Sequence, residues 1–373
     1  MLNIVKNKSN YLVFLIFSVY YVFWILPFNE GVVLDNDSRL YVNLLKLLLV
    51  IFLLALIIES RVSFKVDNFL VFLFFSIYPT LFFITKTYFG VNDLFYFNYL
   101  AFTPLLLASE KLIIDIVSAV PRILAFQVVL DIFILLINGH TLWLNNAIVG
   151  GMGNPSTFGV ACCIGIIFLY FGNNSRKTNN IFFFILALGA VLSQSLLALI
   201  LIIFLTLVLF RLRLSIFIFV FVIFALSILL DGVLSHNLQK LNALLNTGVT
   251  TQSGSASVSL RILWFIEHIE RFKADEISIL IGDIGAIGYI SGDNQFLGIF
   301  SLGGIFLIIP FLIYNTIIFN PLKENSFFDR KLVFCLLIIY FTFFLFNRAL
   351  EYFPFSLIYF VSIIMVKYRR IRS

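Results

Sequence analysis

Long apolar runs separated by short stretches of charge, Gly or Pro fill most of this chain. A helix that crosses a bilayer needs about 20 mostly apolar residues, and somewhat fewer when flanking side chains reach the interface. The pattern predicts spans at residues 11–28, 40–58, 68–84, 94–108, 122–137 and 154–171, and later at 214–230, 295–319, 331–346 and 352–366. The sixth span opens at Asn154-Pro155, which suits Asn as an N-cap with Pro in the first turn.

The apolar stretch 181–210 fits either one long tilted helix or two short helices that meet near Ser193-Gln194-Ser195. Two helices give about twelve spans with both termini on one side. With the N-terminus in the cytoplasm, seventeen of the 25 Lys and Arg residues then fall on the cytoplasmic side. One helix would instead place Arg211, Arg213 and the basic tail outside. The positive-inside rule therefore favours two helices and cytoplasmic termini.

The composition agrees with an α-helical, multi-pass membrane protein. Hydrophobic residues make up 61% of the chain and charged residues 12%, about half the charged share of a soluble domain. A soluble enzyme, a nucleic-acid-binding protein and a disordered scaffold are all poor interpretations. Three cysteines in apolar runs show no pattern of a loop-closing disulfide. The first apolar run lacks a small-residue cleavage site, so we expect a retained first helix.

These patterns divide the chain into three regions. Residues 1–230 hold the predicted transmembrane helices 1–9, and residues 295–373 hold helices 10–12 and a basic cytoplasmic tail. Between them, residues 231–294 form one large polar segment on the outer, periplasmic side. Within it, residues 260–272 (LRILWFIEHIERF) have the apolar face of an amphipathic interfacial helix. We expect chemistry at this outer side.

Several common motifs are missing from the sequence. It has no Walker loop, no His/Cys cluster at metal-ligand spacing and no Gly-x-Ser-x-Gly elbow. The GxxGxxG pattern at 282–288 lies in the outer segment without a βαβ unit, so a dinucleotide site is a poor interpretation. The sequence therefore predicts neither a metal nor an organic cofactor.

Ionisable residues near the predicted outer face each need an explanation, because charge is costly at membrane depth. They are Arg39, Lys46, Arg261, Asp293, Arg348 and Glu351. Lys46 either reaches the interface or pairs with an acid such as Asp131, which itself is more readily a structural partner than a catalyst. The histidines, at 140, 236 and 268, are interpreted as surface residues.

Three of these residues carry a functional alternative. Arg348, with Glu351 three residues later, forms either a salt bridge or a guanidinium grip on a diphosphate. Arg261 offers the same choice, and its place at the start of the amphipathic helix favours function. Asp293 is either a helix N-cap or a carboxylate that accepts a proton from an attacking sugar hydroxyl.

Three segments together resemble the O-antigen polymerase and ligase superfamily of bacterial surface-polysaccharide assembly. Residues 151–158 are similar to its Gly-x-x-x-Asn-Pro stretch, and residues 193–198 to its Ser-Arg-Gly/Ser element between two short helices. The third segment matches the order of an Arg-x-x-x-Trp region, a Gly turn, a His/Asp-Asn element and a Gly pair. It consists of Arg261 to Trp264, Ile281-Gly282, Asp293-Asn294-Gln295-Phe296-Leu297 and Gly303-Gly304.

The resemblance implies a GT-C-like glycosyltransferase of the bacterial inner membrane that uses neither a nucleotide sugar nor a metal. Its donor would be an oligosaccharide on undecaprenyl diphosphate, and the lipid diphosphate would leave with inversion at the sugar. By this resemblance Arg261 would contact the diphosphate and Asp293 would activate the acceptor hydroxyl. Trp264, Asn294, Gln194, Arg348 and Arg39 are the further substrate-binding candidates. Membrane lipid and a chain-length regulator protein are the other candidate partners, and no nucleic acid is expected.

Two departures from the family pattern decide between its branches. Gln194 stands where the family often has Arg, which removes a phosphate ligand unless Arg348 or Arg39 substitutes. Asp293 stands where ligases tend to have His. We therefore expect a polymerase that joins repeat units at the periplasmic face. The alternatives are a ligase that transfers polymer to lipid A core and a flippase or transporter for lipid-linked oligosaccharides, which should show two related halves and broken helices.

Overall fold

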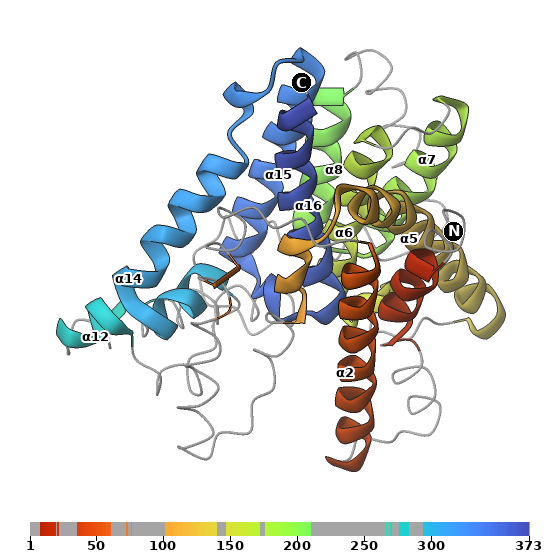
Figure 1. Ribbon diagram of the computed structural model, residues 1–373. Coiled ribbons are helices and arrows are strands. Elements are labelled where there is room, and N and C mark those ends of the chain that lie inside the picture. The colour runs from red at the N-terminus through yellow and green to blue at the C-terminus, as the bar shows by residue number, and fades with distance from the viewer. Residues whose placement is uncertain are drawn as a thin grey trace.

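A computed structural model describes residues 8–19, 21, 36–60, 72–73, 76, 101–139, 147–171, 176–209, 266, 269–270, 276–282 and 294–372. Every regular element among these residues is a helix (Figure 1). The predicted all-α class is therefore confirmed for the described part of the chain. Of the predicted amphipathic helix 260–272, the three described residues are helical. The predicted spans 68–84 and 214–230 fall largely or wholly outside the described residues.

The longer helices follow one another with short connections. After the N-terminal helix Lys8–Val19 they are α2 (Asn36–Glu59), α5 (Glu110–Asn138), α6 (Pro155–Phe171), α7 (Arg176–Leu192), α8 (Leu196–Leu209), α14 (Gln295–Ile318), α15 (Phe327–Phe346) and α16 (Phe353–Arg372). The shorter ones are η1 (Thr103–Leu107), η3 (Gly150–Met152), α12 (Glu276–Ile281), η4 (Pro321–Lys323) and η5 (Ala349–Glu351).

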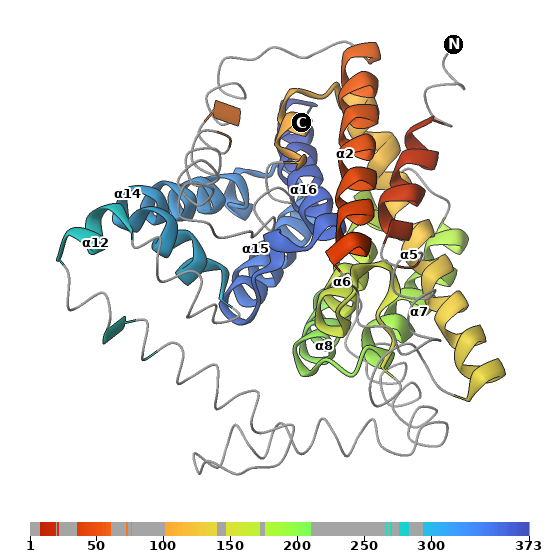
Figure 2. The ribbon, with the colours of Figure 1, turned by 90° about the horizontal axis from the view of Figure 1, so that it is seen from below.

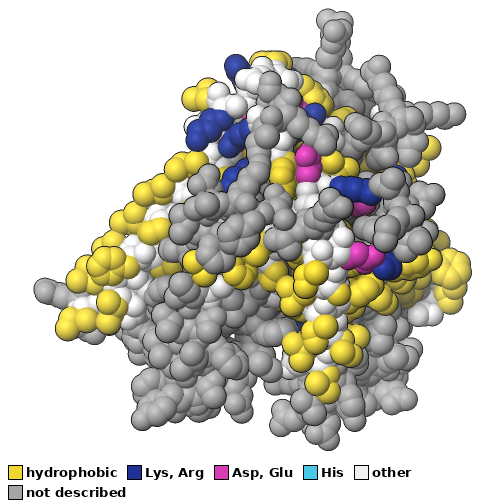
Figure 3. Space-filling view, in the orientation of Figure 1, with side chains coloured by type: hydrophobic (Ala, Val, Ile, Leu, Met, Phe, Trp, Pro, Cys, Tyr) yellow, Lys and Arg dark blue, Asp and Glu magenta, His cyan; other side chains and the backbone are white. Residues whose placement is uncertain are grey.

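Helix α6 forms the centre of the bundle. All of its residues from Thr157 to Leu169 are buried, and it packs against α5, α7, α8, α15 and α16. A helix that is apolar on every side is stable only when neighbours or lipid surround it. Other helices turn large apolar side chains outward, for example Leu48 of α2, Phe133 of α5 and Phe306 of α14. The molecule thus has both an apolar core and an apolar surface (Figure 3).

The described helices alternate in direction, so each end of the bundle collects a defined set of termini. At one end, Lys8 Nζ lies 2.9 Å from Glu59 Oε1, which joins the start of the N-terminal helix to the end of α2. At the same end, the Tyr368 hydroxyl donates to the Ala108 carbonyl, so the end of α16 meets the start of α5. The opposite end holds the starts of α6, α8, α14 and α16.

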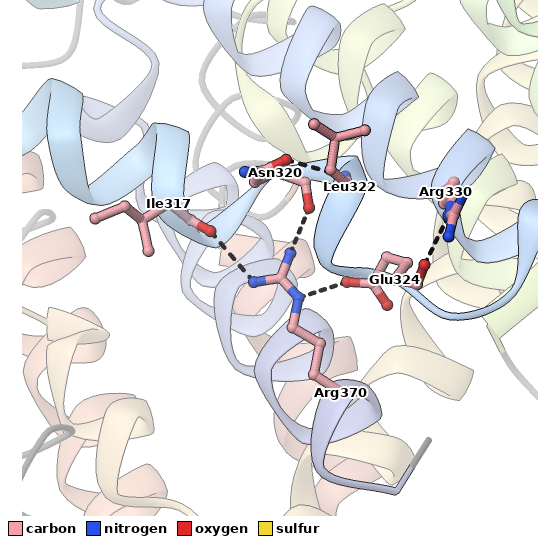
Figure 4. Close-up of polar contacts among 6 residues, drawn as sticks. All are labelled: Ile317, Asn320, Leu322, Glu324, Arg330 and Arg370. Atoms are coloured by element: carbon pink, nitrogen blue, oxygen red, sulfur yellow. Dashed lines mark hydrogen bonds and ion pairs between the residues drawn. The ribbon is translucent and has the colours of Figure 1, made fainter.

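The first of these ends carries most of the described ion pairs. Arg369 lies 3.1 Å from Asp329, and Arg370 bonds Glu324 as well as the carbonyls of Ile317 and Asn320 (Figure 4). Arg370 thereby satisfies two carbonyl groups near the end of α14, where a cation is favoured. Lys and Arg side chains gather toward this end on the face shown in Figure 3. We call it the charged end.

The stretch 181–210 forms two helices, α7 and α8, as predicted. They meet at Ser193-Gln194-Ser195, where Gln194 adopts a left-handed φ of 53°. The sixth predicted span is also confirmed as a helix. The Asn154 side chain accepts hydrogen bonds from the backbone N–H groups of Ser156 and Thr157, at 2.9 and 3.2 Å, and Pro155 lies in the first turn.

The prediction for α5 was wrong at its start. The helix begins at Glu110, twelve residues before the predicted position 122, and its interior contains Pro121. Pro normally ends or kinks a helix, so Pro121 was taken as a boundary. The Ser109 side chain caps the first turn, and burial of Leu112, Ile116 and Val120 holds the extra turns in the bundle. The predicted span 94–108 ends instead in the short helix η1.

The prediction of one straight span at 295–319 was also wrong. Helix α14 breaks at Gly303 and Gly304, and the latter has φ 55° and ψ −147°, a conformation open almost only to glycine. The rings of Phe296 and Phe311 lie 6.3 Å apart, whereas a straight helix would separate these residues by about 22 Å. Figure 2 shows the two arms converging at α12. A Cβ on Gly304 would lie 2.3 Å from the Ile279 carbonyl oxygen, so α12 fits against this break.

Among the described residues one helix, Glu110–Asn138, is both long and apolar enough to cross a membrane. Five shorter apolar helices accompany it, including Gly303–Ile318, the second arm of α14. The number of spans and the GT-C-like architecture remain predictions.

Candidate functional site

Polar side chains from four separate parts of the sequence meet at the end of the bundle opposite the charged end. They come from the start of α6, the junction of α7 and α8, the start of α14 and the loop between α15 and α16. We call this group the helix-end cluster. Its members are Asn154, Ser156, Gln194, Ser195, Asn294, Gln295, Asn347 and Arg348.

Direct contacts join the first two of these segments. The hydroxyl oxygens of Ser156 and Ser195 lie 3.1 Å apart, across 39 positions of sequence. Ser195 also accepts a hydrogen bond from the Ala198 N–H and so caps α8. Close helix packing makes this contact feasible, because a Cβ on Gly159 of α6 would lie 2.3 Å from the Ser193 hydroxyl oxygen. The two segments quoted for the family resemblance thus form one surface.

The α15–α16 loop completes the cluster. The Asn347 side-chain amide lies 3.4 Å from the Ser156 hydroxyl, at the long end of hydrogen-bond range. The Gln295 side-chain oxygen accepts a hydrogen bond of 2.9 Å from the Leu350 N–H. Asn347 and Gln295 are both buried, at 5% and 4% exposure. Two neutral amides therefore fix this loop to α6 and α14.

Arg348 lies between these amide contacts. A Cβ built on Gly298 would be 3.5 Å from Arg348 Nε, so the guanidinium group lies against the first arm of α14. The expected helical pairing of Arg348 with Glu351 was based on a wrong boundary. Helix α15 ends at Phe346, and Arg348 has φ −84° and ψ 65°, so the two residues do not share a helical face. The Glu351 side chain lies outside what the structure describes.

The N-cap of α14 is Asn294, whose side chain accepts a hydrogen bond of 3.0 Å from the Leu297 N–H. The capping role considered for Asp293 therefore belongs to its neighbour. Asp293, Arg261 and Trp264 lie outside the described residues. Arg39 is in the first turn of α2, at the same end of the bundle as the cluster, and its side chain lies outside the description.

Lys46 and Asp131 do not form the pair that was considered for them. Asp131 Oδ2 accepts from the N–H groups of Val149 and Gly150, and its Oδ1 accepts from the Tyr21 hydroxyl. Lys46 is 7% exposed, and its Nζ lies 5.6 Å from the centre of the Phe353 ring. Phe353 begins α16 directly after the cluster loop. Lys46 is thus a second buried cation near this end, and Asp131 has a structural role, as expected.

The sequence did not single out Ser156, Ser195, Asn347 or Gln295 as separate site residues. Ser156 and Ser195 lie inside quoted motifs, and a polar residue after a cap carries little signal on its own. Asn347 immediately precedes Arg348 at the end of an aromatic helix. What could have found it is the rarity of a polar pair in such an apolar run.

The arrangement suits recognition of polar, anionic groups rather than metal chemistry. Hydroxyl and amide groups bond sugar hydroxyls, and an arginine can donate two parallel hydrogen bonds to a phosphate. The described residues contain no group of three His, Cys, Asp or Glu side chains that could hold a metal ion.

No family model matches the chain, no curated protein is similar to it, and no solved structure matches it. The family resemblance therefore stays a prediction, and function is argued from the site itself.

Proposed function

We propose that this protein is a polysaccharide polymerase of the bacterial inner membrane. It would join oligosaccharide repeat units carried on undecaprenyl diphosphate at the periplasmic face, and both termini would lie in the cytoplasm. The helix-end cluster would face the periplasm, and the charged end would face the cytoplasm. The basic residues of the charged end support this orientation.

One observation carries the proposal. Three segments that resemble the polymerase and ligase superfamily are separated by up to about 140 residues, yet Ser156, Ser195 and Gln295 connect to one loop that carries Arg348. A set of motifs that matched by chance would have no reason to converge. A shared substrate supplies such a reason.

The chemistry follows from charge and position. Transfer requires an acceptor hydroxyl that loses a proton and a lipid diphosphate that leaves with added negative charge. Arg348 would stabilise the diphosphate as it leaves, with Arg261 in the role that the resemblance implies. Asp293, adjacent to the cap residue Asn294, would take the proton from the attacking hydroxyl. Gln194, Ser156 and Ser195 would bind sugar hydroxyls.

A transporter for the same lipid-linked oligosaccharide is the second candidate, and the break in α14 favours it. Discontinuous helices are common at the binding sites of transporters. The polar residues, however, gather at one end of the bundle rather than along its middle. A ligase would use the same site with a different acceptor.

The test is deletion of the gene and complementation with wild type, Arg348→Ala, Arg261→Ala or Asp293→Asn, with the cell-surface polysaccharide displayed on a gel. A polymerase predicts that deletion reduces the ladder to core plus a single repeat unit, and that the variants fail to restore it at normal expression. Long chains that stay on the lipid carrier would indicate a ligase. Repeat units trapped in the cytoplasmic leaflet would contradict both enzymes and indicate a flippase.

A further inference from the structure

Two buried polar residues of α5 lie outside the helix-end cluster, and the proposed chemistry does not use them. Gln127 and Asp131 are 2% and 3% exposed and stand four residues apart, so they share one face of the helix. Burial of a carboxylate and an amide among apolar helices is costly unless partners satisfy them. We call this pair the α5 clamp.

The α5 clamp holds three consecutive backbone groups of the loop before α6. Asp131 Oδ2 accepts hydrogen bonds from the N–H groups of Val149 and Gly150, at 3.2 and 2.9 Å. Gln127 Oε1 accepts one from the Gly151 N–H at 3.1 Å. Two side chains one helical turn apart therefore satisfy three successive donors.

The same two side chains also reach the N-terminal helix. Gln127 Nε2 donates to the Phe17 carbonyl at 2.7 Å, and the Tyr21 hydroxyl donates to Asp131 Oδ1. Phe17 and Tyr21 are again four residues apart. The α5 clamp thus joins the N-terminal helix, α5 and the loop at 147–153.

The loop needs such a support because of its glycines. Gly150 and Gly153 have left-handed φ values of 50° and 67°. A Cβ on Gly151 would lie 1.6 Å from the Phe17 carbonyl oxygen, so only glycine fits there. Glycine allows these conformations but also allows many others in the unfolded chain. Hydrogen bonds to the backbone select one of them.

Asn154 and Ser156 follow this loop directly. Asn154 caps α6, and Ser156 contacts both Ser195 and Asn347. We propose that Gln127 and Asp131 are positioning residues, which fix the loop and thereby place Ser156 in the helix-end cluster. The effect on activity rests on the proposed function, whereas the effect on geometry does not. Both carboxylate oxygens of Asp131 face donors of the protein itself, so Asp131 acts on the site through the loop.

A cross-linking experiment tests the geometry without any assay of activity. In full-length protein with Cys162, Cys163 and Cys335 replaced by Ala, the pair Ser156→Cys and Ser195→Cys should form a disulfide rapidly under mild oxidation in native membranes. Asp131→Leu and Gln127→Leu should each slow this reaction at least about fivefold, because the loop loses its backbone partners. Asp131→Asn keeps an acceptor for the loop and a polar partner for Tyr21, so it should cross-link as fast as the parent.

The matched control is Ser118→Ala, a substitution on the same helix. The Ser118 hydroxyl donates to the Asp115 carbonyl of its own helix, so its loss should leave the cross-linking rate unchanged. If Asp131→Leu does not fold, Gln127→Leu provides the same test with a neutral residue. Unchanged cross-linking in the Leu variants that fold would overturn the positioning role.

The same substitutions, in the chain with its native serines and cysteines, are then scored for the surface-polysaccharide ladder. We expect Asp131→Leu and Gln127→Leu to shorten or remove it and Asp131→Asn to preserve it. Loss of the ladder in Asp131→Asn with a normal cross-linking rate would overturn the positioning role, because it would show that the carboxylate itself takes part in the reaction. If the unmodified protein supports no polymerisation, the proposed function fails, while the cross-linking rates still decide the positioning role.

Discussion

The two ends of the helix bundle are held together by different kinds of contact. At the charged end, long cationic side chains pair with carboxylates, as in Lys8–Glu59, Arg369–Asp329 and Arg370–Glu324. At the helix-end cluster, short hydroxyl and amide side chains bond one another and the backbone. The difference matters because short side chains fix backbone positions closely, whereas long exposed ones tolerate displacement.

Burial separates the two ends further. The Lys8 and Glu59 side chains are 40% and 37% exposed, and an exposed pair contributes about 0–1 kcal/mol. Ser195, Gln295 and Asn347 are all less than 9% exposed. A buried network of this kind specifies one conformation, which a site needs more than it needs added stability. The comparison therefore assigns orientation to the charged end and chemistry to the helix-end cluster.

Arg348→Ala gives the largest expected effect. Loss of the guanidinium removes a donor to the leaving diphosphate, so we expect polymerisation to fall at least about 100-fold. The thermal unfolding temperature in detergent should stay close to that of wild type. Arg348→Lys keeps the charge but not the two parallel donors, and should recover only part of the rate. Wild-type polymerisation by Arg348→Ala would remove Arg348 from the site.

Arg370→Ala is the corresponding change at the charged end. Glu324 is 2% exposed, so it would lose its cation while remaining buried. We expect a loss of about 2 kcal/mol in stability, reduced from the fully buried case because Arg370 itself is 16% exposed. Thermal unfolding in detergent measures it. Polymerisation per folded molecule should change less than about twofold, and a large loss of activity at normal stability would contradict the division between the ends.

Ser156→Ala sharpens the comparison within the helix-end cluster. It removes the contacts to Ser195 and Asn347 but no charge, so polymerisation should fall by about three- to tenfold, which corresponds to one hydrogen bond. Thr342→Ala is the matched control, because the Thr342 hydroxyl donates to carbonyls of its own helix, α15. Equal losses in both variants would show that the Ser156 effect is not specific to the site.

Lys8→Ala should have the smallest effect. The exposed Lys8–Glu59 pair contributes less than about 0.5 kcal/mol, and salt should reduce this further. Thermal unfolding at low and high salt measures the contribution. A larger effect that persists at high salt would contradict the description of this pair as a surface contact.

The sequence predicted local features well. Asn154-Pro155 marked the start of α6, and the distribution of Lys and Arg separated α7 from α8. Both signals act over one or two helical turns. The early start of α5 was missed because its first turns are stabilised by burial against other helices, which outweighs the local preference of Pro121 to end a helix. The break in α14 was missed for a similar reason, since α12 supports it from a distant part of the chain.

The site was predicted only in part. Arg348, Gln194 and Asn294 were named from charge or resemblance, and the structure brings them to one end of the bundle. The contacts of Ser156 with Ser195 and Asn347 connect residues 39 and 191 positions apart. The α5 clamp depends on contacts of similar range, and the pairing of Asp131 with Lys46 was wrong because backbone N–H groups compete for the carboxylate.

The most direct measurement is elongation by the purified protein in lipid vesicles. The vesicles would contain an undecaprenyl-diphosphate-linked repeat unit and a metal chelator, but no nucleotide sugar. We expect glycans of two and more repeat units, with one free lipid diphosphate released for each bond formed. Arg370→Ala should retain this reaction per folded molecule, and Arg348→Ala should lose it. Repeat units that remain single, or that cross the bilayer without elongation, would contradict a polymerase with its site in the helix-end cluster.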